Sequence, residues 1–104
     1  MSLAEYQKEL AWKIVDYQKE IDPYEFRDCY DDENDAFNEC LEALSKPSGI
    51  KTIIKTFKND IDYMKSFNSN ESFIKKSILN ATNLMNEVVN YSVDLKKMEG
   101  GMEL

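Results

Sequence analysis

Glycine and proline occur at only five of the 104 positions, and this scarcity constrains the fold more than any other feature of the chain. The five residues are Pro23, Pro47, Gly49, Gly100 and Gly101. Because these residue types end helices and form turns, long uninterrupted segments must separate the few breaks. Within those segments, apolar residues recur at intervals of three and four, and strand-like alternation is absent. The sequence therefore predicts one all-α domain over residues 1–104, a small helical bundle of about four helices with a long C-terminal helix.

The N-terminal segment has the start and stop signals of a helix from Ser2 to about Ile21. Ser2 and Glu5 match a capping box, in which each side chain accepts a hydrogen bond from the other residue's amide. Asp22 and Pro23 end the helix, because the residue before a proline is pushed out of the helical conformation. Proline also suits the first turn of a new helix, and Asp22 is a suitable cap for it. The face expected to meet the core carries Leu3, Leu10, Ile14, Tyr17 and Ile21.

Residues 23–45 combine an apolar face with an acidic one. The apolar positions are Phe26, Tyr30, Phe37, Cys40, Leu41 and Leu44. The acidic positions repeat at intervals of three and four, and they are Glu25, Asp28, Asp32, Asp35, Glu39 and Glu42. This double pattern predicts one continuous helix with an acidic stripe. Aspartate is an indifferent helix former and a good N-cap, so a second helix that begins near Asp32 is the alternative.

Two turns divide the rest of the chain, one at residues 45–49 and one at residues 68–70. A third helix is expected between them, with core positions at Ile50, Ile53, Ile54, Phe57, Ile61 and Met64. The last helix is expected to end at Gly100, because glycine favours the position just past a helix end. At 1.5 Å per residue it would be roughly 40 Å long and would extend beyond the others. Its two apolar seams contain Ile74, Ile78, Ala81, Met85, Val88 and Leu95, and Leu84, Tyr91 and Met98.

Charge is distributed unevenly along the chain. Residues 1–45 hold 13 acidic and 4 basic residues, whereas residues 46–104 hold 7 acidic and 9 basic residues. The acidic N-terminal part is repelled by phosphate and attracts cationic surfaces, so we expect a basic protein partner and no direct binding to nucleic acid. No segment is apolar enough to predict a membrane span, and no signal peptide is evident at Met1, so a cytoplasmic location is expected.

The residues needed for familiar catalytic or cofactor chemistry are missing. The chain has no histidine, no phosphate-binding glycine loop and no nucleophile-elbow serine, so we expect neither enzymatic activity nor a bound cofactor. Cys29 and Cys40 are expected to be buried, reduced thiols. Residues 31–42 resemble a calcium-binding EF-hand loop in part, but Ala36 replaces the glycine of the sharp turn. An acid-rich helix start is the preferred interpretation, and no metal site is predicted.

Two aromatic residues complete the candidate partner-binding surface. Trp12 lies off the apolar face of the first helix, and Tyr24 begins the second, as expected of aromatic residues that anchor interfaces. The alternative is that a wide core buries both side chains. The acidic positions listed above form the rest of this surface, unless Lys51, Lys55 and Lys58 neutralise them within the molecule.

These observations predict a small non-enzymatic protein-protein interaction module. Twelve lysines against one arginine, with nine asparagines, are typical of a low-GC bacterium, its phage or a mobile element. The leading hypothesis is an interaction module that docks through its acidic face, a class that in such a source covers immunity, anti-defence and regulatory proteins. The first alternative is a homo-oligomeric structural protein, a homodimer through the C-terminal helix. The second is a protein that binds a metal through the acids of residues 31–42.

Overall fold

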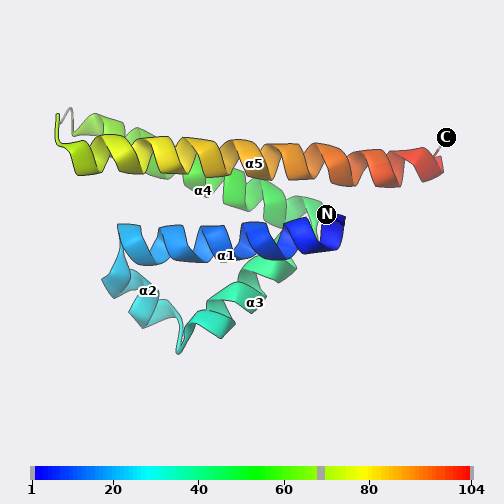
Figure 1. Ribbon diagram of the computed structural model, residues 1–104, viewed down its shortest axis with the longest axis horizontal. Coiled ribbons are helices and arrows are strands. Elements are labelled where there is room, and N and C mark those ends of the chain that lie inside the picture. Colours follow the sequence, from blue (N-terminus) through cyan, green and yellow to red (C-terminus); the bar gives the residue numbers. More distant parts are fainter. Residues whose placement is uncertain (1, 68–69, 104) are drawn as a thin grey trace.

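The computed structural model describes the backbone of residues 2–67 and 70–103, and the side chains of these ranges up to residue 97. All the regular structure described is helical, which confirms the all-α prediction (Figure 1). Residues 2–67 and 70–103 form five helices instead of about four. They are α1 (Leu3–Ile21), α2 (Pro23–Cys29), α3 (Glu33–Leu44), α4 (Pro47–Ser66) and α5 (Ser72–Glu103).

Helix α1 has the boundaries and the buried face that its sequence predicts. The Ser2 hydroxyl accepts a hydrogen bond from the Glu5 amide at 3.2 Å, so the N-cap predicted there is formed. The side chains that α1 buries are Leu10, Ala11, Ile14, Val15 and Tyr17.

The segment from Pro23 to Leu44 forms two helices, so the preferred prediction of one continuous helix is wrong and the alternative is correct. Tyr30, at the end of α2, has an extended backbone with a φ of −134°. The Asp32 carboxylate then caps α3 by accepting a hydrogen bond from the Asp35 amide at 2.9 Å. The break leaves the first amides of α3 without helical partners, and the Asp32 side chain pairs with one of them, so a new start is favoured here despite the overlapping periodicities.

The next two boundaries also differ from the prediction. Helix α4 begins at Pro47 and not after Gly49, because proline is well suited to the first helical position. Helix α5 continues through Gly100 to Glu103, because a glycine weakens a helix by about 1 kcal/mol without forcing it to end. Of the turn predicted at residues 68–70, positions 68 and 69 lie outside the described residues.

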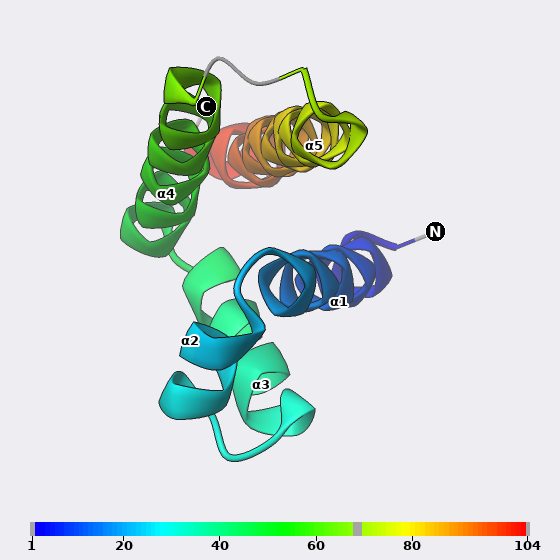
Figure 2. The same ribbon diagram turned by 90° about the vertical axis from the view of Figure 1, so that its left-hand side faces the viewer.

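The helices form two groups on either side of α1. Helices α4 and α5 pack against each other in antiparallel orientation, and α1 lies between this pair and the segment that contains α2 and α3 (Figures 1 and 2). Helix α3 also contacts α4, whereas the backbone of α2 comes close to that of α1 alone among the described helices. The far end of α5 extends beyond α1 and α4, as its length predicts (Figure 1).

The core lies between α1, α4 and α5, and α3 closes one end of it. The apolar faces predicted for these helices all contribute to it. Its buried members are Leu10, Ala11, Ile14, Tyr17, Leu44, Ile50, Phe57, Ile61, Met64, Ala81, Val88 and Tyr91. Helix α2 contributes no buried residue to the core. Its residues Glu25, Phe26 and Cys29 line a cavity instead.

Candidate partner-binding site

The six acids predicted to form one stripe lie on two separate helices. Glu25 and Asp28 belong to α2, whereas Asp35, Glu39 and Glu42 belong to α3, with Asp32 as the N-cap of α3. All six side chains are exposed to solvent. The break between α2 and α3 changes the direction of the chain, so the acids form two adjoining faces instead of one stripe. We call these six residues the acidic surface.

Almost none of this negative charge is neutralised within the molecule. Glu42 pairs with Lys46 across one helical turn, at 3.3 Å. In the part of the chain that the structure describes, the other five acids have no lysine or arginine nitrogen within 4.0 Å. Lys51, Lys55 and Lys58, considered above as internal partners, form no ion pair among the described residues. The acidic surface is therefore open to an external cation.

The two aromatic candidates have different surroundings. Trp12 stacks on Phe37 of α3 with ring centroids 4.3 Å apart and an angle of 15° between the rings, so one of its faces is used to join α1 to α3. Its side chain is nevertheless 37% exposed. Tyr24 is 74% exposed, and the Arg27 guanidinium carbon lies 5.8 Å from the centre of its ring. Tyr24 is thus the more accessible of the two.

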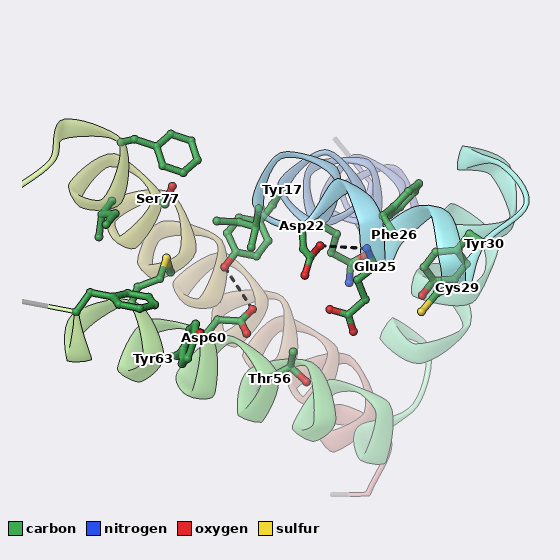
Figure 3. A pocket seen from close by; sticks show the side chains of 16 residues that line it. Tyr17, Asp22, Glu25, Phe26, Cys29, Tyr30, Thr56, Asp60, Tyr63 and Ser77 are labelled. Atoms are coloured by element: carbon green, nitrogen blue, oxygen red, sulfur yellow. Dashed lines mark hydrogen bonds between the residues drawn. The ribbon is translucent and has the colours of Figure 1, made fainter. Parts of the chain in front are cut away.

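The structure also contains a pocket that the sequence did not predict. It has a volume of about 490 Å³ and lies between the corner formed by α1 and α2 and the facing sides of α4 and α5 (Figure 3). Acidic and aromatic side chains both line it. The acids are Asp22, Glu25 and Asp60, and the aromatic residues are Tyr17, Phe26, Tyr30, Tyr63, Phe67 and Phe73. No lysine or arginine is among the residues that line this pocket.

A second pocket of about 330 Å³ continues the first along α4. It is lined in part by Glu39 and Cys40 of α3, and it too has no basic lining residue. The residues common to both pockets are Tyr17, Gln18, Tyr30, Thr56 and Asp60. We call the combined cavity the α4 groove. It adjoins the acidic surface, because Glu25 and Glu39 belong to both.

Asp60 lies at the junction of the two pockets and has an unusual environment for a carboxylate. The Tyr17 hydroxyl donates a hydrogen bond to Asp60 Oδ2 at 3.3 Å, which joins α1 to α4 (Figure 3). Desolvation raises the pKa of Asp60 above its ordinary value, although the hydrogen bond from Tyr17 acts in the opposite direction. Burial also raises the pKa of Tyr17, so its hydroxyl remains a donor. Among the described residues, no cationic group lies within 4.0 Å of Asp60.

The sequence did contain a signal for Asp60. This acid occurs three residues after Phe57 and four before Met64, both buried members of the apolar face of α4. A carboxylate at that spacing lies beside the apolar face and is partly desolvated in the folded protein. The identity of its neighbours could not be predicted, because Tyr17 is 43 residues away in the chain.

The two cysteines are free thiols, as predicted, but Cys40 is only partly buried and Cys29 is not buried at all. Burial raises the pKa of Cys40 to about 12, so this thiol is protonated and unreactive at neutral pH. Cys29 is exposed, which corrects the prediction that both would be buried. The reason is its position as the last residue of α2, a helix that buries none of its side chains.

Over the described residues, no three histidine, cysteine, aspartate or glutamate side chains are grouped as a metal site would require. Residues 33–42 of the segment that partly resembles a calcium loop are helical and belong to α3. None of the described helices has the length and apolar character needed to cross a membrane.

Comparison with known proteins found no matching family model, no matching curated protein and no matching solved structure. The site therefore has to be interpreted from its own geometry and charge.

Proposed function

We propose that this protein is a small non-enzymatic interaction module that binds a basic protein partner through the acidic surface of α2 and α3. The observation that supports this proposal is the set of five exposed acids without an internal cation, namely Glu25, Asp28, Asp32, Asp35 and Glu39. The composition is typical of a low-GC bacterium, phage or mobile element, and the module we propose would serve there as an immunity, anti-defence or regulatory protein.

Unneutralised acids on adjoining helices repel one another, and a basic partner removes that repulsion. Exposed charges of this kind contribute little to folding, yet they accelerate association and select among partners. Tyr24, next to Glu25 at the start of α2, adds a large exposed ring that can be buried on binding. A complex formed in this way depends on salt, because dissolved ions screen exposed charges beyond about 10 Å at 0.1 M.

Exposed apolar residues on α5 favour a second candidate function, self-association. Leu79, Val89 and Val93 are large apolar side chains exposed on this helix. Leu79 and Val93 are two heptads apart, and Val89 lies one turn before Val93, so the three share one side of the helix. A homodimer through α5 would bury them and would leave the acidic surface free.

The test compares the proteins captured from a lysate of the source cell by three versions of the chain. The wild type is compared with a triple reversal, Asp28→Lys, Asp35→Lys and Glu42→Lys, which spares the α3 cap Asp32 and every residue that lines the α4 groove. The control reverses three exposed acids elsewhere, Asp16, Asp62 and Asp94, and so has the same net charge.

We expect one partner to be captured by the wild type and the control, and to be lost with the triple reversal. Thermal melts of all three proteins must show that the fold is retained. If the triple reversal retains the partner, or if the control loses it equally, the acidic surface is not the binding site. Size-exclusion chromatography with light scattering measures the molar mass of the chain in solution and so shows whether it forms a homodimer through α5 instead.

A further inference from the structure

We infer that the α4 groove receives an arginine side chain of the partner. This inference rests on the proposed function for the source of the cation, but the chemistry of the groove can be tested separately. Three properties of the groove support it: the convergence of carboxylates, the aromatic walls, and the continuity with the acidic surface.

Three carboxylates face the same space, and no lysine or arginine of the described residues lines it. Figure 3 shows the carboxylates of Asp22, Glu25 and Asp60 directed toward the space between the α1–α2 corner and α4. Asp22 accepts a hydrogen bond from the Glu25 amide at 3.0 Å, and Asp60 accepts one from Tyr17 at 3.3 Å. A carboxylate has about four acceptor sites, so each retains capacity for a charged donor. The partial desolvation of Asp60 makes its unpaired charge costly, and a bound cation would offset that cost.

The aromatic walls favour a guanidinium group over an ammonium group or a metal ion. Tyr63, Phe67 and Phe73 are each more than half exposed at the pocket, and the rings of Tyr63 and Phe67 meet edge to face with centroids 4.9 Å apart. A guanidinium group is planar and weakly hydrated, so it can stack on such rings while it donates two parallel hydrogen bonds to a carboxylate. An ammonium ion is strongly hydrated and lacks the planar fork. A divalent metal needs several oxygen ligands within bonding distance of one point, and no three acidic side chains of the described residues lie close enough together to provide them.

The position of the groove indicates that the cation is carried by a protein. Glu25 belongs to both the acidic surface and the first pocket, and Glu39 belongs to both the acidic surface and the second. A partner bound to α2 and α3 therefore lies beside the opening of the groove. The exposed rings around the opening provide apolar contact area for the chain on either side of an inserted arginine, which a small free cation would leave uncovered.

The test uses peptides, so it does not require the partner to be known. The ¹⁵N-labelled protein is titrated with acetyl-Gly-Arg-Gly-amide and, in parallel, with the same peptide carrying citrulline. Citrulline has nearly the shape of arginine and no charge. We expect amide shifts at residues lining the groove with the arginine peptide, and a dissociation constant at least tenfold higher with the citrulline peptide.

A matched pair of variants locates the bound group. Asp60→Asn removes the partly buried charge, and Asp62→Asn removes an exposed charge from the same helix at a position that does not line the groove. We expect the affinity for the arginine peptide to fall at least fivefold in Asp60→Asn and to stay within twofold in Asp62→Asn. Both variants should give well-dispersed spectra, because neither substitution creates a buried unpaired group.

Equal binding of the two peptides, or equal effects of the two substitutions, would overturn the inference. So would binding of spermidine at least tenfold tighter than that of the arginine peptide, because the groove would then be a polyamine site. If the triple reversal described above abolishes partner capture and no arginine-specific shifts occur, the proposed function stands and this inference fails. If the groove binds arginine selectively and no capture depends on the acidic surface, the proposed function fails while the arginine specificity of the groove is supported.

Discussion

Replacing Gly49 with alanine tests the crossing of α3 and α4, on which the second pocket of the groove depends. Gly49 lies in the first turn of α4, directly over the end of α3. A Cβ atom at this position would lie 2.7 Å from Ala43 Cα and 2.8 Å from the Ala43 carbonyl carbon, and real Cβ atoms essentially never come closer than 3.0 Å to other atoms. The neighbouring atoms are backbone and cannot rotate away, so the two helices would have to separate.

Two opposing effects set the size of the change in stability. Alanine is a better helix former than glycine, which would stabilise α4 by at most about 1 kcal/mol. Forcing an extra carbon into a tightly packed contact typically costs about 1–3 kcal/mol and occasionally more. The cost is expected at the upper end here, because separating the helices also loosens the fully buried Leu44 and the buried Ile50 beside the crossing. We therefore expect a net loss of about 2 kcal/mol, or a fall in Tm of roughly 8 °C for a domain of this size.

Urea unfolding and thermal melts followed by circular dichroism at 222 nm would measure this loss. Ser48→Ala is the matched control, because Ser48 is an exposed residue in the same turn of α4. Its effect should remain within about 0.5 kcal/mol. If Gly49→Ala raised the Tm, helix propensity would have outweighed the steric clash, and the close approach of α3 to α4 described here would be wrong.

Three further predictions concern the candidate site. Trp12→Ala should lower the free energy of unfolding by about 1–3 kcal/mol in urea titrations because it removes the stack on Phe37, whereas Tyr24→Ala should change it by less than about 0.5 kcal/mol. Asp60→Asn should raise the Tm at pH 7, because a carboxylate whose pKa is raised by folding opposes folding once it is ionised. The gain in Tm should shrink as the pH falls toward about 4, where the carboxylate becomes protonated. A difference in Tm between the two proteins that stays constant across this pH range would show that the pKa of Asp60 is not raised by folding. Millimolar Ca²⁺ or Mg²⁺ should leave the Tm unchanged, because the described residues contain no group of acids that could hold a metal ion. A rise in Tm would reveal a site specific to the folded state, since such a site stabilises the protein by mass action.

Local signals in the sequence predicted much of the helical framework. The caps at Ser2 and Asp22 were correctly identified, because a capping side chain bonds to an amide only three residues away. The core-facing sides of α1, α4 and α5 followed from the periodicity of their apolar residues.

The errors arose where two local signals conflicted. Between α2 and α3, the amphipathic periodicity predicted one continuous helix, whereas Asp32 indicated the start of a second helix. The hydrogen bond from the Asp35 amide to the Asp32 carboxylate shows that a second helix begins there. At the start of α4, composition predicted a turn through Gly49, but the proline at position 47 already provides the first helical residue.

The groove could not be predicted, because it is formed by residues distant in the sequence. Tyr17 of α1 meets Asp60 of α4 only because α3 and α5 hold those helices at a fixed spacing. Each acid was visible in the sequence, but the convergence of Asp22, Glu25 and Asp60 depends on tertiary packing that no local pattern specifies.

Amide hydrogen exchange of the chain, alone and saturated with the captured partner, tests the central claim most directly. The proposed binding mode predicts slower exchange in α2, in α3 and in the part of α4 that lines the groove, with α5 beyond residue 79 unchanged. Protection confined to α5 around Leu79, Val89 and Val93, with α2 and α3 exchanging as in the free protein, would contradict the proposal and show that binding occurs through the exposed apolar side of α5.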